Sequence, residues 1–303
     1  MTDHERDHAP EESQDPEQGS SEQDFRSGFV ALVGRPNVGK STLLNKILDR
    51  KVSIVSDRPQ TTRTQVRGVL NRPDAQVVFV DTPGIHKPRT ALGEHLNDTA
   101  SAAAAGVDVV CLVVDVRAGI GRGDEFVARR LPPETMVVLN KIDAVNAARL
   151  DEQREQAIDR LGFPELVAVS ARTGAGVPKL IDLVIPRLPS GPKWYPDDMV
   201  TDVPEAFWVA ELVREQLLAR TRDELPHSIA TRVTEWDWPY IRCEILVERD
   251  SQKAIVIGKN GSVLKTVGTA VREQLPPGAY LDLFVKVDKD WQRRPRAFSR
   301  LGY

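Results

Sequence analysis

Cysteine and histidine are scarce in this 303-residue chain, which holds two cysteines, Cys111 and Cys243, and five histidines. A disulfide framework or a zinc site needs more cysteines, or cysteine and histidine at short spacing, so the composition excludes both. Each cysteine lies inside an apolar, strand-like run. We therefore expect two reduced thiols buried in hydrophobic cores.

Long hydrophobic runs are also missing. No segment approaches the about 20 apolar residues of a membrane-spanning helix, and the longest apolar stretch, Val107–Val116, is interrupted by Asp108 and Asp115. The first residues lack the basic and apolar regions of a signal peptide. We therefore expect a cytoplasmic protein, for which any contact with the inner face of the cell membrane is peripheral.

Acidic and basic residues nearly balance over the whole chain, with a net charge of −3, but they are unevenly distributed. Residues 1–26 hold nine acids and two bases and almost no large apolar side chains, so we expect a disordered acidic tail. The last stretch, Lys286–Tyr303, carries six bases and two acids. A basic end of this kind suits a polyanionic partner.

Beyond the tail, short apolar strands alternate with helical segments, which is typical of a mainly parallel sheet covered by helices on both faces. We therefore assign residues 27–190 to an α/β domain. Its predicted strands are Phe29–Val33, Gln76–Val80, Val109–Val114, Met136–Leu139 and Leu166–Val169, and its predicted helices include Ser41–Leu48, Gly123–Arg130, Asp151–Leu161 and Pro178–Leu188.

Prolines and glycines then crowd the chain, and we assign residues 191–204 to a linker. A second, α+β domain is predicted over residues 205–290, followed by a basic C-terminal tail over 291–303. The elements predicted in this domain are a helix at Glu205–Arg220, strands at Ser228–Trp236 and Tyr240–Glu248, a short helix, a helix at Ser262–Gln274 and a strand at Tyr280–Val287.

A phosphate-binding motif, G-x-x-x-x-G-K-S, is formed by Gly34-Arg35-Pro36-Asn37-Val38-Gly39-Lys40-Ser41. It follows a predicted strand and precedes a predicted helix, which is the context that a P-loop requires. The backbone N–H groups and the helix N-terminus bind phosphate oxygens. We expect Lys40 to reach the β- and γ-phosphates and Ser41 to ligate Mg²⁺.

Two further segments predict contacts to the γ-phosphate and the metal. The turn Asp81-Thr82-Pro83-Gly84 ends a strand, so Asp81 can hold Mg²⁺ through water and the Gly84 N–H can donate to the γ-phosphate. The preceding loop contains two threonines, one of which can complete the Mg²⁺ shell. Thr62 is the predicted ligand, and Thr61 is the alternative.

The base is predicted to be guanine. The segment Asn140-Lys141-Ile142-Asp143 follows a strand, and the Asp143 carboxylate can accept both the N1–H and the exocyclic amino group, a pattern that adenine does not offer. Asn140 and Lys141 then frame the base. The later segment Ser170-Ala171-Arg172 supports this prediction, since the Ala171 N–H can donate to guanine O6.

The second domain contains a turn of the Gly-x-x-Gly type, formed by Gly258-Lys259-Asn260-Gly261 between two helices, with Lys265 in the following helix. Such a turn lets a nucleic-acid backbone approach closely and clamps about four nucleotides of single strand. We therefore predict RNA binding there. Trp291, close to the C-terminal bases, either stacks on a nucleotide or is a buried anchor.

These motifs, in this order, resemble the translation-factor-related class of small GTPases, and the segments Gly34–Ser41, Gln60–Arg63 and Asp81–His86 resemble its Era-like group. From about Gly28 to Tyr303 the chain is similar to the Era family, which comprises bacterial GTPases with a C-terminal KH domain. The resemblance implies a P-loop GTPase domain followed by a type II KH domain. It also implies slow hydrolysis of GTP to GDP and phosphate, with binding to small-subunit ribosomal RNA and a role in assembly of the small ribosomal subunit. We expect a monomer.

One position departs from many GTPases, which place a water-orienting glutamine after the Asp-x-x-Gly glycine. Here the residue is Ile85, counted among the GTP-binding residues for its backbone, and His86 follows. The Era-like group resembles GTPases that work without this glutamine, and in some of them K⁺ is held partly by a P-loop asparagine, here Asn37. The predicted catalytic residues are accordingly Asn37, Lys40, Thr62 and Gly84.

Two alternatives stay open. A related GTPase could act in tRNA modification or large-subunit assembly. The tRNA-modifying relatives carry a reactive C-terminal cysteine and the tandem relatives two P-loops, neither of which this chain has. The chain could also be an RNA-binding module with a structural nucleotide that never turns over. Phosphate release measured with and without RNA discriminates between these functions.

Overall fold

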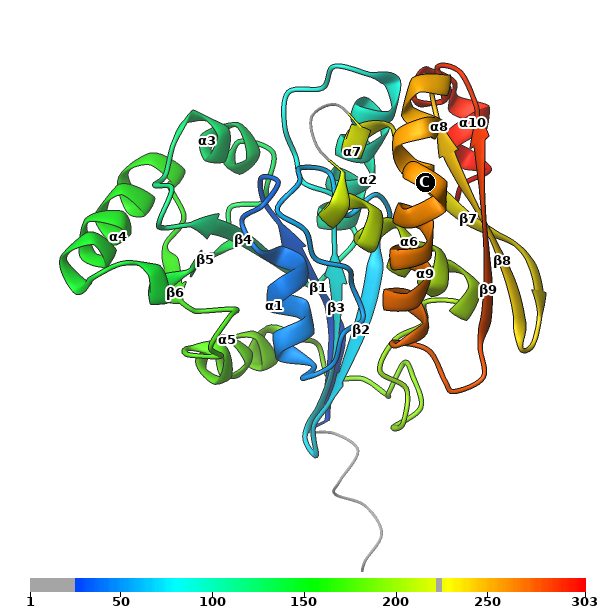
Figure 1. Ribbon diagram of the computed structural model, residues 1–303. Coiled ribbons are helices and arrows are strands. Elements are labelled where there is room, and N and C mark those ends of the chain that lie inside the picture. Colours follow the sequence, from blue (N-terminus) through cyan, green and yellow to red (C-terminus); the bar gives the residue numbers. More distant parts are fainter. Residues whose placement is uncertain (1–24, 222–224) are drawn as a thin grey trace, which may run out of the picture.

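A computed structural model describes residues 25–221 and 225–303 (Figure 1). Most of the predicted acidic tail therefore lies outside the described residues. The predicted boundary at residue 26 is too late, because the first strand begins at Arg26. The Arg26 guanidinium donates to the carbonyl oxygens of Pro186 and Leu188, which fixes the start of this strand to the end of the α/β domain.

The first unit contains β1 Arg26–Val33, α1 Lys40–Ile47, β2 Val66–Asn71, β3 Ala75–Asp81, α2 Ala91–Ala105, β4 Val109–Asp115, α3 Arg122–Ala128, β5 Met136–Asn140, the 3₁₀ turn η1 Ile142–Ala144, α4 Ala147–Leu161, β6 Glu165–Ala168, α5 Val177–Val184 and the 3₁₀ turn η2 Ile185–Arg187. The second contains α6 Glu205–Arg220, α7 Leu225–Ser228, β7 Ala230–Asp237, β8 Tyr240–Val247, α8 Asp250–Ile257, η3 Lys259–Gly261, α9 Ser262–Arg272, β9 Tyr280–Val287, η4 Trp291–Arg293 and α10 Pro295–Ser299.

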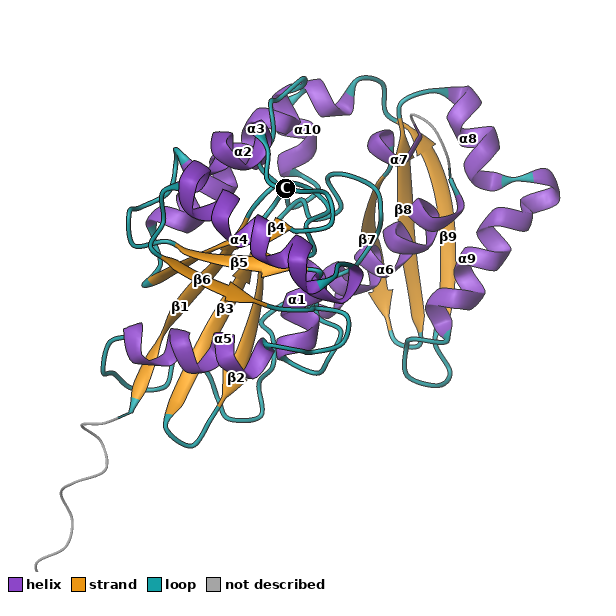
Figure 2. Cartoon of the chain, turned by 90° about the vertical axis from the view of Figure 1, so that its left-hand side faces the viewer, coloured by secondary structure: helices purple, strands orange, loops and turns teal. Residues whose placement is uncertain are grey.

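The first sheet has the strand order β2-β3-β1-β4-β5-β6 and is parallel except for β2, which pairs with β3 in the antiparallel sense. Its central strands are buried on both faces. One face packs against α1 and α5, and the other packs against α2, α3 and α4 (Figure 2). The predicted fold class is confirmed. Because parallel strands end at one edge of a sheet, the segments after β1, β3, β5 and β6 meet there.

Two elements of the first unit were not predicted, and one helix was predicted too long. The prediction names neither β2 nor α2. The predicted helix Pro178–Leu188 ends as an α-helix at Val184 and continues as a 3₁₀ turn through Arg187, because Pro186 cannot donate the next helical hydrogen bond. The linker runs along the edge strand β2, where the Val69 N–H donates to the Val200 carbonyl over 2.8 Å. This contact covers part of an otherwise open sheet edge.

The second sheet has the order β7-β8-β9, with β7 antiparallel and β9 parallel to β8. Helices α6, α8 and α9 pack on one of its faces around a core that includes Cys243. The other cysteine, Cys111, lies in the core of the first sheet. Burial raises the pKa of both thiols to about 12, so they stay protonated. No helix in the described ranges is long and apolar enough to cross a membrane.

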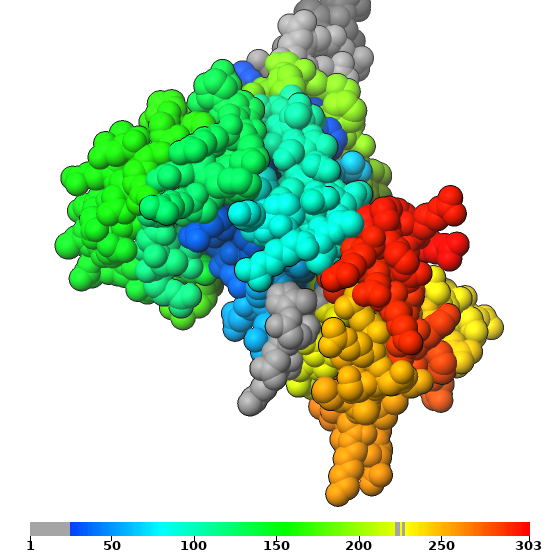
Figure 3. All heavy atoms as spheres, turned by 90° about the horizontal axis from the view of Figure 1, so that it is seen from above, coloured from blue at the N-terminus to red at the C-terminus, as the bar shows by residue number. Residues whose placement is uncertain are grey.

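The C-terminal segment, residues 291–303, folds back between the two units. Figure 3 shows it in red between α2, in cyan, and the second sheet. Trp291, Phe298 and Leu301 are buried in one cluster with Leu92 and Leu96 of α2. The Trp291 Nε1–H donates to the Ser228 carbonyl over 2.9 Å. Of the two roles considered for Trp291, the structure therefore shows the buried anchor.

Candidate active site and nucleic-acid interface

The segment between β1 and α1 forms a tight loop that leaves room for phosphates. Gly39 adopts a φ of 98°, and a Cβ there would lie 2.5 Å from the Asn140 Nδ2 atom, so only glycine fits. A Cβ at Gly84 would lie 2.6 Å from the Pro36 backbone nitrogen. The Asp-x-x-Gly turn thus lies directly against the P-loop. Residues of the P-loop, the loop at 54–62, Gly84 and Lys141 line one pocket.

Lys40 reaches across the P-loop from the first turn of α1. Its buried ammonium donates to the carbonyl oxygens of Gly34, over 3.3 Å, and Arg35, over 3.1 Å. Burial lowers the pKa of Lys40 to about 8, and the nearby Asp81 carboxylate offsets part of this shift. A bound phosphate would stabilise the charged form of this ammonium, because its negative oxygens would replace the solvation lost on burial.

Three hydroxyl groups, one from α1 and two from the loop between α1 and β2, converge on Asp81 at the end of β3. The Asp81 Oδ2 atom accepts from Ser41 over 2.6 Å, Ser53 over 2.9 Å and Thr62 over 3.3 Å, and the Ser41 and Thr62 hydroxyls lie 3.0 Å apart. The Thr61 hydroxyl turns away and donates to a backbone carbonyl in its own loop. Of the two candidate threonines, Thr62 is therefore the one beside Asp81.

The same cluster fits a magnesium ion. The buried Asp81 Oδ1 atom has no hydrogen-bond partner among the described residues. Burial raises the pKa of Asp81, while Lys40 and the three hydroxyls lower it. The net shift is upward, so these neighbours do not fully replace the solvation that the carboxylate has lost. Hard oxygen ligands next to a phosphate pocket are what Mg²⁺ requires. Ser41, Thr62 and Asp81 are the residues that would hold it, as predicted ligands.

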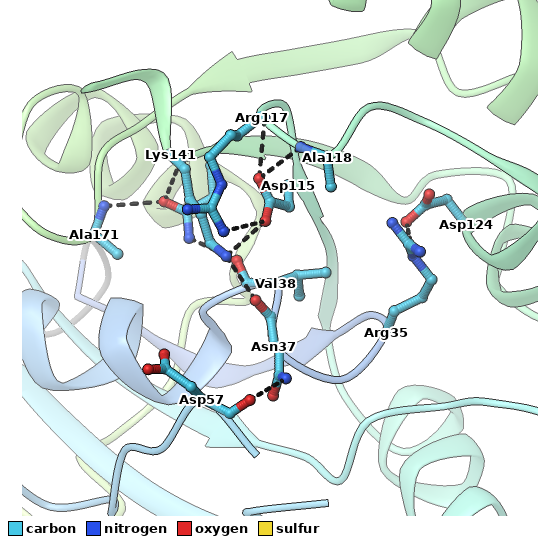
Figure 4. A network of polar contacts seen from close by, with 11 residues as sticks. Arg35, Asn37, Val38, Asp57, Asp115, Arg117, Ala118, Asp124, Lys141 and Ala171 are labelled. Atoms are coloured by element: carbon cyan, nitrogen blue, oxygen red, sulfur yellow. Dashed lines mark hydrogen bonds and ion pairs between the residues drawn. The ribbon is translucent and has the colours of Figure 1, made fainter. Parts of the chain in front are cut away.

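The predicted base-binding segment is held by backbone carbonyls of the P-loop and by Asp115 at the end of β4 (Figure 4). Asn140 donates through Nδ2 to the Val38 carbonyl over 2.9 Å. Lys141 lies over the P-loop, where its ammonium donates to the Asn37 carbonyl over 2.7 Å and to Asp115 Oδ2 over 2.6 Å. The Lys141 side chain is thus positioned to form one wall of a base pocket.

The other wall contains Asp143 and the loop after β6. Asp143 accepts from the Ser170 hydroxyl over 2.6 Å and pairs with Arg172 over 2.5 Å. The Ser170 hydrogen bond is the main cause that lowers the pKa of Asp143, so the carboxylate stays ionised, as guanine recognition requires. The Ala171 N–H donates to Asn140 Oδ1 over 3.0 Å, and its bond to guanine O6 stays a prediction.

Two residues of the turn after β3 point their side chains into the protein. Ile85 is 1% exposed in the hydrophobic core, and its N–H donates to the Gly34 carbonyl over 3.1 Å. The buried Thr82 hydroxyl donates to the Leu32 carbonyl over 2.8 Å. Any contact from these two residues to nucleotide must therefore come from the backbone. His86 lies beside Gln60 of the preceding loop, at 2.7 Å between the two Nε2 atoms.

Several supporting residues escaped the sequence analysis. Asp115 anchors Lys141, Ser53 donates to Asp81, and the buried Asp124 holds Arg35 of the P-loop over 2.8 Å. Asp115 could have been found, because it ends β4 at the same sheet edge as the other motifs.

Asn37 donates through Nδ2 to the Asp57 carbonyl over 2.7 Å, which joins the P-loop to the loop that carries Thr62.

That loop is also bound to the second unit. The Arg63 guanidinium is 2% exposed, donates to the Ile229 carbonyl over 2.7 Å, and lies 5.4 Å from the ring centroids of both Trp291 and Tyr303. Arg214 of α6, also buried, donates to the Thr61 carbonyl. The loop that carries Thr62 therefore contacts the Asp81 side chain on one side and the second unit on the other.

The Gly-x-x-Gly turn joins α8 to α9 at an exposed end of the second unit. Gly258, Asn260 and Gly261 all have positive φ angles, of 73°, 52° and 76°. A Cβ at Gly258 would lie 2.9 Å from the backbone nitrogen of Val263 in the first turn of α9, so the close approach of the two helices requires glycine. Lys259 is exposed within the turn.

Exposed apolar residues of α8 and β9 were not predicted. Ile255 of α8 is 56% exposed and Phe284 of β9 is 46% exposed, and the Lys253 ammonium lies 6.0 Å from the Phe284 ring centroid. The exposed Lys265 follows the turn in α9. Aromatic and apolar surfaces beside cations are what unstacked bases and their phosphates bind.

Comparisons with known proteins agree on both units. The profile of the family described as 50S ribosome-binding GTPase matches residues 29–141, and that of the KH domain matches residues 224–292. A crystal structure of Era in complex with MgGDPNP and nucleotides 1506–1542 of 16S ribosomal RNA is 38% identical, with a TM-score of 0.88, over 92% of this chain and 99% of that one. A single-residue variant of Aquifex aeolicus Era bound to GDP·AlF₄⁻ matches with the same identity and coverage and a TM-score of 0.86.

Proposed function

The chain belongs to the Era family of GTPases, and on that premise we propose that it is a GTP-hydrolysing switch that binds small-subunit ribosomal RNA through its KH domain. Its task is then to assist small-subunit assembly, in the cytoplasm. The observation that carries this proposal is the match across both units to a relative bound to MgGDPNP and 16S ribosomal RNA. The profile described as 50S ribosome-binding matches only residues within the GTPase domain, so it does not decide between the subunits.

For hydrolysis, the residues of the pocket would position the nucleotide and stabilise its negative charge. Lys40, which lies against the P-loop carbonyls, would reach the β- and γ-phosphates, and the Gly84 N–H, in a turn packed against the P-loop, would donate to the γ-phosphate. A bound Mg²⁺ would neutralise charge that develops on the phosphate oxygens. Ile85 is buried in the core and cannot orient the attacking water. Slow intrinsic turnover follows, and a K⁺ ion or a ribosomal partner that orders the loops would raise it.

RNA binding is assigned to the turn at residues 258–261 and to Lys265. The left-handed turn brings backbone N–H groups and the Lys259 ammonium close to a phosphate, and α9 begins directly after it. Ile255, in the helix that leads into the turn, offers apolar surface to bases that leave the clamp. This arrangement fits single-stranded RNA, whose bases are free to stack.

Communication between the two sites is carried by the loop that holds Thr62. Thr62 would keep this loop ordered while a γ-phosphate and Mg²⁺ are bound, and would let it go after hydrolysis. Arg63, the next residue, lies beside the rings of Trp291 and Tyr303 of the C-terminal segment. A change at Thr62 therefore changes what Arg63 contacts in the KH unit. RNA then binds one nucleotide state more tightly than the other, by the linkage that couples any two such equilibria.

Phosphate release tests this function. We expect slow release of phosphate from GTP by purified protein with Mg²⁺, faster release in K⁺ than in Na⁺, and a further increase with an RNA equivalent to nucleotides 1506–1542 of 16S ribosomal RNA. The Lys40→Ala variant, which loses the phosphate-binding ammonium, is the control and should lower GTP affinity by about 100-fold. An absence of turnover under every condition would support an RNA-binding module with a structural nucleotide instead.

A further inference from the structure

A basic pocket lies on the KH sheet face that is opposite to α6, α8 and α9. Val285 of β9 points towards those helices, so Lys286 points to the other side. We call this region the C-terminal basic pocket, and its cations are Arg232 of β7, Lys286 of β9, and Arg293, Arg294, Arg296 and Arg300 of the C-terminal segment.

The charge of this pocket is only partly neutralised. Glu244 contacts Arg232 over 2.6 Å and Lys286 over 3.8 Å, and Asp288 pairs with Arg294. The other three guanidinium groups, those of Arg293, Arg296 and Arg300, are exposed and form no ion pair with any residue in the described ranges. An excess of positive charge around a concave surface attracts a polyanion.

The pocket is built on an anchored segment. Phe298 and Leu301 are buried against α2 and lie beside Ala297 and Arg300 in the chain. The Phe298 N–H donates to the Arg294 carbonyl, which closes the short helix α10. The cations are therefore held in place by a packed core. Less conformational entropy is lost on binding a ligand than would be lost by a disordered basic tail.

We propose that the C-terminal basic pocket binds the phosphate backbone of the ribosomal RNA at a second site, separate from the Gly-x-x-Gly turn. This inference rests on the proposed function. Five of the six cations are arginines, whose planar forks match phosphate oxygens in pairs. The large apolar residues of the pocket, Leu246 and Leu301, are buried, so they cannot insert into a bilayer. RNA is thus favoured over an anionic membrane.

The length of the RNA in the related complex supports a second contact. That RNA spans nucleotides 1506–1542, whereas a Gly-x-x-Gly turn clamps about four. The turn belongs to the helical side of the sheet, and the C-terminal basic pocket belongs to the opposite side. An RNA bound at both places passes β9, which is the edge strand, where the exposed Lys286 lies.

The salt dependence of RNA affinity tests the proposal in the full-length protein. The test variant is Arg293→Gln/Arg296→Gln/Arg300→Gln. The matched control, Arg50→Gln/Arg72→Gln/Arg129→Gln, removes the same charge from exposed arginines of the GTPase domain that form no ion pair with a described residue. Each is titrated with an RNA equivalent to nucleotides 1506–1542, and with the shortest single-stranded piece of it that still depends on Lys259.

For the long RNA, we expect the test variant to lower the slope of log affinity against log salt by about 2, since each lost phosphate contact lowers it by roughly 0.7. Its affinity for the short piece should equal that of the control. Equal slopes for test variant and control would overturn the proposal, as would an equal loss for both RNAs. Loss of binding to phosphatidylglycerol vesicles with unchanged RNA slopes would assign the pocket to a membrane. If wild-type protein binds neither RNA, the proposed function itself fails.

Discussion

Thr62 and Arg63 are consecutive residues whose side chains enter different sites. The Thr62 hydroxyl lies 3.3 Å from Asp81 Oδ2, in the cluster that fits Mg²⁺. The Arg63 guanidinium lies 5.4 Å from the rings of Trp291 and Tyr303, in the interface with the KH unit. One peptide bond therefore joins the proposed γ-phosphate-sensing site to the interface with the KH unit.

Replacement of Arg63 should separate these two functions. In Arg63→Gln, Thr62 and the P-loop are unchanged, so GTP affinity should stay within about threefold of wild type, while the cation beside the two aromatic rings is lost. We expect the ratio of RNA affinities in the GDPNP and GDP states to fall towards 1 from a wild-type value within the usual range of coupling, roughly 5–150-fold. Fluorescence anisotropy with labelled RNA measures both affinities. A wild-type ratio retained in the variant would show that coupling takes another route.

The two adjacent threonines should differ in their effect on magnesium. Thr62→Val removes the hydroxyl beside Asp81, so the Mg²⁺ concentration for half-maximal GTP hydrolysis should rise by about tenfold or more. Thr61→Val is the matched control, because its hydroxyl donates to the Arg58 carbonyl instead. Magnesium titrations of phosphate release measure both. The reverse order of effects would make Thr61 the ligand.

Asp143 should determine the choice of base. Asp143→Asn replaces the ionised carboxylate that faces the base by an amide, so affinity for GTP should fall by about 100-fold and affinity for xanthosine triphosphate should rise. Asp115→Asn is the control, because it removes the charge that pairs with Lys141 and Arg117, away from Asp143, and should weaken both nucleotides alike. Competition for a fluorescent nucleotide measures the preference. Unchanged guanine preference in Asp143→Asn would contradict the assignment.

Binding of GTP should take up a proton at alkaline pH. In the nucleotide-free protein the pKa of Lys40 is lowered to about 8, so at pH 9 Lys40 is deprotonated in roughly 0.9 of the molecules. Bound phosphates favour the charged form and raise this pKa again, so binding and protonation are linked. We expect uptake of about 0.9 proton at pH 9 and almost none at about pH 6.5, where Lys40 is already charged. Calorimetry in buffers of different ionisation enthalpy measures the uptake, and equal values at the two pH values would contradict the prediction.

The sequence was sufficient for the order of most elements and for the segments that surround the pocket. Each motif is a short contiguous segment that follows a strand, so its function can be recognised from neighbouring residues alone. Lys40, Asp81 and Asn140 could therefore be assigned to the pocket without coordinates. The parallel sheet then brings them together, because its strands end at a common edge.

Contacts between the two units could not be predicted. Glu211 and Arg214 of α6 are charged, which favours exposure, yet both are buried because the helix packs between the KH sheet and the loop that carries Thr62. Arg63 is a similar case, since its burial depends on a C-terminal segment more than 200 residues away in the sequence. Ser53 carries no local signal, because its role depends only on where Asp81 lies in space.

The affinity of full-length protein for an RNA equivalent to nucleotides 1506–1542 of 16S ribosomal RNA, measured in parallel with Mg·GDPNP and with Mg·GDP, tests the proposed switch most directly. We predict binding at least about fivefold tighter in the GDPNP state, the lower end of typical coupling. Equal affinities in the two states would contradict a nucleotide-controlled switch on ribosomal RNA.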